Sequence, residues 1–240
     1  MARDVALQRR AAQTGETVFS VYSWNKPTLS FGRNQPAIGS YDLAKIRGDG
    51  IDIVRRPTGG RAILHHREVT YSVTAPIDDG SLTETYSRIN RILQHGLNAL
   101  GVMVEAAAGS QRTEAPSIRP CFETPARGEL VARGAKLVGS AQWREHGALL
   151  QHGSILVDDD QSSLLGLSLT PVGNERWNPP ASLHSLLGRA PEAVEIAAVM
   201  LDAVRVLEDE DVSELKEDDV RAAALERVPQ FLDEGWTWRR

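Results

Sequence analysis

The single cysteine of the chain, Cys121, lies in a short segment between Pro120 and Pro125. Proline fixes its own φ and has no backbone N–H to donate, so this segment is expected to be a shaped loop rather than a helix or a central strand. Lys136 follows fifteen residues later, in a segment typical of a β-strand. A cation close to a thiol stabilises the thiolate, which is the nucleophilic form. Cys121 and Lys136 therefore predict the nucleophile and activating cation of a cysteine acyltransferase.

Other interpretations of both residues stay open at this point. A lone cysteine is often a small buried hydrophobic residue. A lysine beside a hairpin turn is often only an exposed charge. The loop position of Cys121 favours function, because catalytic groups are commonly held in loops on a rigid scaffold.

The segment Arg55-Arg56-Pro57-Thr58-Gly59-Gly60-Arg61 is the second candidate for chemistry. Adjacent glycines let a backbone approach a ligand closely and expose its N–H groups. The flanking guanidinium groups suit a phosphate or a carboxylate. An ordinary hairpin tip with solvated arginines is the competing interpretation. The segment is not a nucleotide fingerprint, since neither G-x-G-x-x-G nor G-x-x-x-x-G-K-[ST] occurs in the chain.

Strand alternation around Lys136 predicts which side chains share a face. It places Lys136, Val138, Ser140 and Gln142 on one face and Leu137, Gly139 and Ala141 on the other. The following strand contributes His152, either as a structural histidine or as a group beside the site. His65 and His66 are adjacent and would point to opposite faces of a strand. With a single cysteine, this arrangement argues against a zinc site.

These residues must be positioned by a mixture of helices and strands. The periodicity predicts helices over 2–13, 41–47, 82–100, 191–207 and 212–231, and strands over 18–24, 28–32, 51–54, 62–65 and 69–75, the last two paired. A three-stranded meander is predicted over 129–132, 135–144 and 148–157, with turns at Arg133-Gly134 and His146-Gly147. Ser81 and Glu84 have the spacing of a capping box. A proline-containing loop is expected over 174–180.

Composition limits the class of protein. The 240 residues are 41% hydrophobic, which is enough for one substantial core, and we expect a single α/β domain over 1–240. A formal net charge of −5 argues against general nucleic-acid binding. One cysteine excludes an intramolecular disulfide, and the first residues lack the apolar core of a signal peptide. No apolar run approaches the roughly 18 residues that cross a bilayer. We therefore expect a cytoplasmic protein.

Three motifs in order give the chain a family resemblance. Residues 55–65, followed by Glu68-Val69-Thr70-Tyr71-Ser72, resemble the catalytic domain of biotin and lipoate protein ligases. Residues 120–125 with 134–142, and then 150–155, resemble its cysteine-dependent octanoyltransferase branch, the enzymes that start protein lipoylation. The similarity covers nearly the whole chain. It implies an α/β (α+β) fold with a mixed, largely antiparallel sheet flanked by helices, and no separate accessory domain.

The resemblance also implies a ping-pong mechanism. Cys121 would take an octanoyl group from octanoyl–acyl carrier protein and pass it to a lysine of a lipoyl-accepting protein, such as the glycine cleavage H protein. Lys136 matches the family lysine that contacts the acyl carbonyl. The residues implied to line the acyl tunnel and its mouth are Arg56, Thr58, Gly59, Gly60, Arg61, His65, Gly139, Ser140, Gln142, His152 and Gly153. No cofactor, metal, nucleic acid or membrane is implied, and the protein is expected to be a monomer.

Three alternatives share parts of this prediction. An ATP-dependent lipoate–protein ligase would use the Gly59-Gly60 loop and Lys136 to hold an acyl-adenylate, with Cys121 incidental. Arg61 stands where many ligases have a third glycine, which argues against adenylate binding. An octanoyl amidotransferase acting between two lipoyl-accepting proteins would use the same thiol. A binding module for lipoylated domains, without turnover, would need neither Cys121 nor Lys136.

Overall fold

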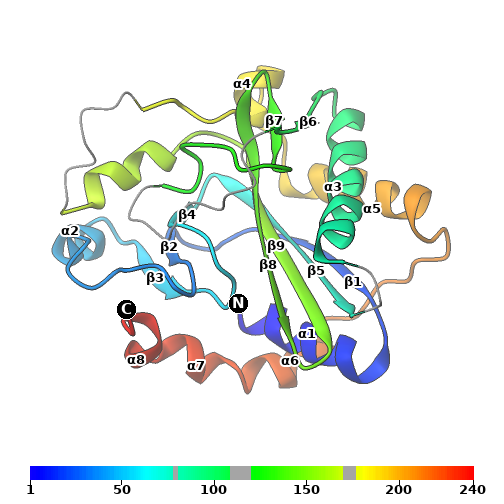
Figure 1. Cartoon of the computed structure of the whole chain (residues 1–240), viewed down its shortest axis with the longest axis horizontal. Helices are drawn as coiled ribbons and strands as arrows, with labels where there is room; N and C mark the ends of the chain where they lie inside the picture. The colour runs from blue at the N-terminus through cyan, green and yellow to red at the C-terminus, as the bar shows by residue number, and fades with distance from the viewer. Residues whose placement is uncertain (78–80, 109–119, 170–176) are drawn as a thin grey trace.

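A six-stranded antiparallel sheet is the centre of the computed structural model, which describes residues 1–77, 81–108, 120–169 and 177–240. Figure 1 shows β8 (Ala135–Glu145) and β9 (Ala148–Leu156) crossing the middle of the molecule as a hairpin. In spatial order the strands are β1 (Val18–Tyr22), β5 (Glu68–Pro76), β9 (Ala148–Leu156), β8 (Ala135–Glu145), β7 (Leu130–Ala132) and β6 (Glu105–Ala106). The predicted mixed α/β fold with a largely antiparallel sheet is confirmed. The loop expected over 174–180 lies partly outside the described residues.

The meander turns follow directly from the sequence. Arg133 and Gly134 have φ of 51° and 77°, and His146 and Gly147 have φ of 52° and 81°. Two successive residues with positive φ make the turn that matches the twist of an antiparallel hairpin. The predicted meander is therefore confirmed, and it brings β7, β8 and β9 into adjacent positions.

A second, three-stranded sheet lies beside the first. Its order is β3 (Asp52–Arg55), β2 (Thr28–Phe31) and β4 (Ile63–His65), with β2 parallel to β3 and antiparallel to β4. Helix α2 (Leu43–Gly48) and the 3₁₀ helix η1 (Gln161–Leu167) contribute to its apolar core. This sheet supplies the Gly-Gly loop, which follows β3.

The expected pairing of strands 62–65 and 69–75 is wrong. Strand β4 pairs with β2, whereas β5 pairs with β1 and β9 in the other sheet. A two-residue hairpin needs positive φ in its turn, and His66 and Arg67 do not have it. The chain therefore passes from the small sheet into the large one between β4 and β5.

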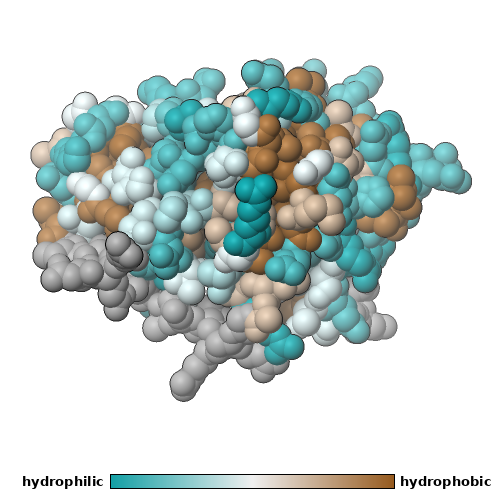
Figure 2. All heavy atoms as spheres, turned by 90° about the horizontal axis from the view of Figure 1, so that it is seen from above, coloured by the Kyte–Doolittle hydropathy of each residue, from teal (hydrophilic) through white to brown (hydrophobic). Residues whose placement is uncertain are grey.

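Helices cover the two faces of the large sheet unequally. α3 (Leu82–Ala99) and α5 (Ala193–Leu207) pack on one face and bury residues such as Leu93, Leu97 and Met200 in the main core. The predicted capping box starts α3, since Ser81 Oγ accepts a hydrogen bond from Glu84 N and Glu84 Oε2 accepts one from Ser81 N. Viewed from above, apolar side chains gather on the half of the surface over α3, α4 (Leu183–Leu187) and α5, among hydrophilic ones (Figure 2).

The opposite face carries α1 (Ala2–Thr14), close to the helix expected over 2–13, and Gly15 ends it in the left-handed region. Gln8 Nε2 of α1 donates to the carbonyl of Ala148 at 3.0 Å, so the helix is hydrogen-bonded to the end of the β8–β9 hairpin. Beside α1, residues of β5, β8 and β9 line a cavity. None of the described helices is both long enough and apolar enough to span a bilayer.

The helix expected over 212–231 is wrong in its extent. The structure has α6 (Asp218–Leu225), α7 (Val228–Leu232) and α8 (Glu234–Thr237) instead of one long helix. Pro229 stands at the start of α7. Proline lacks an N–H and clashes with the carbonyl four residues earlier, so it starts a new helix rather than continuing α6. The resulting bend returns the chain end to the small sheet.

Candidate active site

The Cys121 loop is held against the small sheet. Cys121 N donates to the carbonyl of Ala62 at 3.0 Å, just before β4. The next side chain, Phe122, is buried and packs with Ile63 and Leu156, and Cys121 packs against this cluster. The loop is thus fixed by one backbone hydrogen bond and one buried ring, which leaves Cys121 partly exposed.

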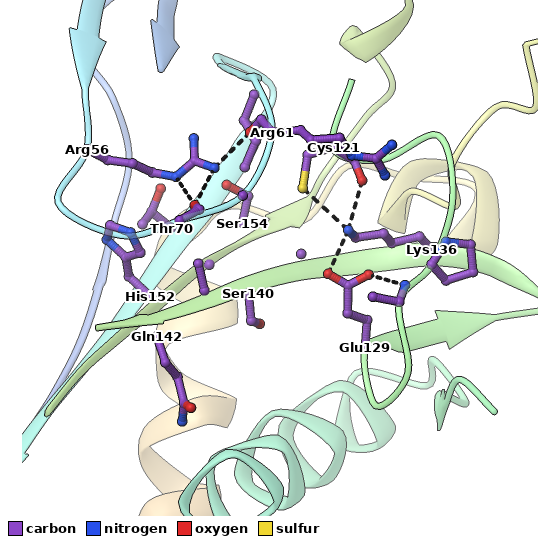
Figure 3. Close-up of a pocket in the computed structure, with 18 of the residues that line it drawn as sticks. Arg56, Arg61, Thr70, Cys121, Glu129, Lys136, Ser140, Gln142, His152 and Ser154 are labelled. Carbon is purple, nitrogen blue, oxygen red and sulfur yellow. Dashed lines mark hydrogen bonds and ion pairs between the residues drawn. The ribbon is translucent and has the colours of Figure 1, made fainter. Parts of the chain in front are cut away.

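Lys136 meets the thiol. Its Nζ lies 3.4 Å from Cys121 Sγ and donates to the carbonyl oxygen of Cys121 at 2.9 Å (Figure 3). It also lies 5.0 Å from the centre of the Phe122 ring, a cation–π contact. Only 2% of Lys136 is exposed, so it is not the solvated charge of the competing interpretation. The predicted contact between Cys121 and Lys136 is therefore present.

Glu129 completes this arrangement, and the sequence prediction missed it. Its Oε1 lies 2.8 Å from Lys136 Nζ, and its Oε2 accepts a hydrogen bond from Ala126 N at 2.7 Å. The three acceptors around Nζ equal the three protons of an ammonium group. The sequence did contain a signal for this pair. Glu129 directly precedes a short apolar strand, and Lys136 lies on the strand that follows it in the meander. Buried charges are normally paired, so a buried Lys136 is expected to have a carboxylate partner.

The prediction that Lys136 shares a face of β8 with Ser140 and Gln142 is wrong. The register between β7 and β8 shifts, so that Leu130 faces Val138 while Val131 faces Lys136. Such a bulge puts an additional residue, Leu137, on one strand, and the strict alternation is lost. The main core accordingly contains both Leu137 and Val138.

Lys136 instead shares its face with Gly139. A Cβ on Gly139 would lie 3.1 Å from Lys136 Cε. Ser140 and Gln142 point away from Lys136 (Figure 3). The Ser140 hydroxyl lies 2.6 Å from the hydroxyl of Tyr71, and Gln142 Nε2 donates to Gln151 at 2.8 Å.

Arg56 shapes the Gly-Gly loop from within. Its guanidinium donates to the carbonyls of Gly59 and Arg61 and to both oxygens of Ser30. Burial lowers the pKa of Arg56 to about 10, which leaves it charged at neutral pH. Gly60 has φ of 96°. These contacts make Arg56 a structural centre of the loop rather than a solvated arginine.

His65 belongs to a buried hydrogen-bonded chain. Its Nε2 lies 2.8 Å from Ser30 Oγ and its Nδ1 lies 3.1 Å from Glu68 Oε1. Trp24 stacks on the imidazole with ring centres 4.3 Å apart. The geometry is similar to a hydrolase triad, but Ser30 is fully buried and also accepts from Arg56. These hydrogen bonds therefore orient His65 and Arg56, and Ser30 is not exposed as a nucleophile.

His152 belongs to a second such chain. Its Nε2 lies 2.7 Å from Thr58 Oγ1 and its Nδ1 lies 3.3 Å from Asp4 Oδ2, which also accepts from Tyr22. Burial lowers the pKa of His152, although Asp4 acts in the opposite direction. Burial alone would raise the pKa of Asp4, but nearby positive charge and its hydrogen bonds hold it well below the ordinary value. These hydrogen bonds link α1, β9 and the Gly-Gly loop.

One cavity of about 820 Å³ joins these groups, a volume typical of small-molecule sites. The predicted residues that line it are Arg56, Gly59, Gly60, Arg61, His65, Cys121, Lys136, Gly139, Ser140, Gln142, His152 and Gly153. Thr58 is not among its lining residues and is fully buried behind His152. Lining residues that the sequence prediction missed include Ile63, Thr70, Tyr86, Glu129 and Ser154. In the described part of the chain, no three His, Cys, Asp or Glu side chains gather as metal ligands.

Comparison with known proteins identifies the family. A model of the lipoyl protein ligase A/B catalytic domain matches residues 1–205. The chain belongs to this family. The predicted resemblance is thereby confirmed.

Curated relatives of this lipoyl protein ligase family member have the name of the predicted branch. Octanoyltransferase LipM of Kyrpidia tusciae is 38% identical over 237 residues, which cover 92% of this chain and 86% of the relative. LipM of Carboxydothermus hydrogenoformans is 41% identical over 193 residues, covering 78% and 71%.

Solved structures of family members share the fold. The bi-partite lipoate protein ligase of Thermoplasma acidophilum, studied with its E2 lipoyl domain, has a TM-score of 0.78 at 20% identity, over 99% of this chain and 89% of that one. A lipoate-protein ligase A bound with ATP has a TM-score of 0.77 at 21% identity, over 99% and 92%. At these identities the likeness concerns the fold alone. The roles of the individual cavity residues stay predictions.

Proposed function

We propose that this protein is an octanoyltransferase of protein lipoylation that carries the acyl group as a thioester on Cys121. The donor is octanoyl–acyl carrier protein, and the acceptor is a lysine of a lipoyl-accepting protein such as the glycine cleavage H protein. The observation that carries the proposal is the contact of Lys136 Nζ with Cys121 Sγ at 3.4 Å, inside a cavity large enough for a small acyl ligand. The names of the curated relatives support the same chemistry.

The first half-reaction is an exchange of thioesters. The Cys121 thiolate attacks the carbonyl carbon of the donor thioester, a C–S bond to Cys121 forms, and the bond to the carrier's sulfur breaks. The carrier leaves as a thiolate that takes a proton from water. Lys136 stabilises the attacking thiolate, and Glu129 holds Lys136 in place because its Oε1 lies 2.8 Å from Nζ.

The second half-reaction forms an amide. The neutral acceptor amine attacks the acyl carbon, a C–N bond forms, and the bond to Cys121 Sγ breaks. The amine loses a proton to water, and Cys121 returns as the thiolate. Acylation removes the negative charge from Sγ, so the Lys136 N–H that pointed to it is free to donate to the acyl carbonyl. Lys136 thereby stabilises the thiolate in the first half-reaction and donates a hydrogen bond to the acyl carbonyl oxygen in the second.

The ATP-dependent ligase is the main competing function, because solved ligases share the fold. Two observations favour the transferase. Cys121 contacts Lys136, which a ligase does not need. The Arg56 guanidinium is occupied by the loop carbonyls and the Ser30 oxygens, and is not free for a phosphate.

Intact-mass measurement tests the proposal directly. The protein is incubated with octanoyl–acyl carrier protein and no ATP. We expect one octanoyl adduct on the wild type, and none on Cys121→Ser, which is the matched control because serine keeps the size of the side chain. An adduct that persists in Cys121→Ser would refute the thioester.

Changing the donor separates the alternatives. ATP-dependent modification of an acceptor by free octanoate or lipoate, in wild type and Cys121→Ser alike, would establish the ligase. Octanoyl transfer from an octanoylated acceptor protein, with none from the acyl carrier protein, would establish the amidotransferase.

A further inference from the structure

One buried hydroxyl in the wall of the cavity is left without a partner. Ser154 lines the cavity and is 1% exposed, and its Oγ makes no hydrogen bond with any residue that the structure describes. Buried polar groups in folded proteins are nearly always paired, because an unpaired one loses its bonds to water and gains none in return. In a ligand cavity, the bound molecule can supply the missing acceptor.

Two neighbouring hydroxyls in the cavity wall already have partners. Thr70, which pairs with Ser154 across β5 and β9, donates from Oγ1 to Glu68 Oε1 at 2.8 Å. The Ser140 hydroxyl lies 2.6 Å from that of Tyr71. Both hydroxyls therefore serve the protein's own hydrogen bonding. Ser154 differs from them, because its hydroxyl is uncommitted within the part of the chain that the structure describes.

The strand β9 places Ser154 beside the reacting groups. Side chains two residues apart on a strand point to the same side, so Ser154 shares its face with Leu156. Leu156 belongs to the apolar cluster against which Cys121 packs. Figure 3 shows the Ser154 side chain rising from the sheet toward the side on which Cys121 and the Gly-Gly loop lie. Ser154 and Cys121 therefore contribute to the same wall of the cavity.

Gly139 leaves a space between Ser154 and Lys136. It is directly opposite Ser154 on the neighbouring strand β8, and the β-carbons of such opposed residues lie about 4.5–5.5 Å apart. A Cβ on Gly139 would lie 3.4 Å from Lys136 Nζ and 3.1 Å from Phe122 Cζ. Because glycine has no Cβ, this position is open to the cavity that Gly139 lines. A ligand atom there lies between the Lys136 ammonium and the Ser154 side chain.

We propose that Ser154 is a further catalytic residue, which donates a hydrogen bond to the carbonyl oxygen of the octanoyl group above Gly139. This inference rests on the proposed function. When the thiolate or the amine attacks the acyl carbon, the π electrons of the carbonyl move onto its oxygen, and they return as the bond to the leaving sulfur breaks. A donor aimed at this oxygen stabilises the charge that develops in the transition state. Lys136 supplies one such donor and Ser154 the second.

Two reactions of the same sulfur separate carbonyl stabilisation from thiolate chemistry. Acylation by octanoyl–acyl carrier protein passes through an oxyanion. Alkylation by iodoacetamide forms a C–S bond at a methylene carbon, expels iodide and develops no oxyanion. Cys121 is the single cysteine, so the intact mass reports both reactions at one atom. We expect Ser154→Ala to slow acylation about 10- to 100-fold and to leave the rate of alkylation unchanged.

The stability of Ser154→Ala is a second readout. Removing a buried hydroxyl that has no partner also removes its desolvation cost. The Tm should therefore equal or exceed that of the wild type while the acylation rate falls. A side chain that served only the packing of the sheet would lower both quantities together.

Ser72→Ala is the matched control. Ser72 lies on β5, is likewise 1% exposed, and its Oγ has no partner among the described residues. It is not one of the residues that line the cavity. The same deletion of a buried hydroxyl at this position should leave the rates of acylation and alkylation at the wild-type values.

Three outcomes would overturn the inference. Equal acylation rates of Ser154→Ala and the wild type would remove the catalytic role. An equal loss of acylation and alkylation would mean that Ser154 acts on the thiol itself. A matching loss of acylation in Ser72→Ala would assign the effect to the sheet and not to the cavity. Failure of the wild type to form an octanoyl adduct, with alkylation intact, would instead refute the proposed function, so the two failures are distinguishable.

Discussion

The buried pair of Glu129 and Lys136 gives the sharpest test of the site. Glu129→Gln keeps the shape of the side chain and removes its charge. The pair is separated by 2.8 Å, with Glu129 7% and Lys136 2% exposed. At an effective dielectric constant of ~20, charges at this distance attract by about 6 kcal/mol before desolvation is considered. Removing one partner of such a buried pair typically costs about 3–5 kcal/mol.

The lower end of this range applies to Glu129→Gln, because the glutamine carbonyl can still accept from Lys136. A loss of about 3 kcal/mol corresponds to a fall in Tm of about 6–12 °C for a chain of this size. Acylation of Cys121 should slow roughly 10- to 100-fold, since Lys136 is no longer held at the thiol. Thermal unfolding and the intact-mass rate measure the two effects separately.

A double-mutant cycle with Lys136→Met isolates the ion pair. Glu129→Leu combined with Lys136→Met leaves no unpaired charge, so it should recover stability relative to Glu129→Leu alone while staying inactive. Glu129→Gln unfolding at the wild-type temperature would refute the buried ion pair. A double variant no more stable than Glu129→Leu would show that charge is not what couples the two residues.

Three further predictions concern the surroundings of the site. Gly32→Ala should lower both Tm and the acylation rate, because the new Cβ would lie 1.9 Å from the Gly60 carbonyl oxygen and displace the loop. Gly48→Ala is the control, since its Cβ would meet nothing within 4 Å and should change neither quantity. A Gly32→Ala variant with the wild-type Tm and rate would contradict the close approach. Arg56→Lys should lower the free energy of unfolding by about 2 kcal/mol in urea titration, because an ammonium cannot reproduce the fork of bonds to the loop, and an unchanged value would disprove that role. Burial holds the pKa of His152 below its ordinary value, so the unfolded chain takes up a proton below about pH 6.5 while the folded protein resists it. Acidification from pH 7 to 5 should therefore destabilise the wild type by up to about 1.4 kcal/mol per pH unit from this group, and His152→Gln should show a shallower slope; equal slopes would rule the effect out.

Much of the local structure could be predicted from neighbouring residues. The Ser81 and Glu84 capping box, the first helix and the two hairpin turns depend only on nearby backbone and side chains. The exchange between sheets at His66 could not be predicted in this way. Adjacent apolar strands look paired in sequence, and only the competing partners β2 and β9 decide otherwise.

The sequence by itself determined that Cys121 stands in a proline-bounded loop with a lysine on the following hairpin, and the family motifs predicted that the two meet. These features depend on residue types and short spacings. The tertiary structure decided that Glu129 joins Lys136 and that a bulge turns Lys136 toward Gly139 and away from Ser140. It also decided that the Arg33 guanidinium lies over the ring of Trp143. Each of these results depends on the packing of segments that are distant in sequence or on a register shift of one residue. Periodicity carries no information about either.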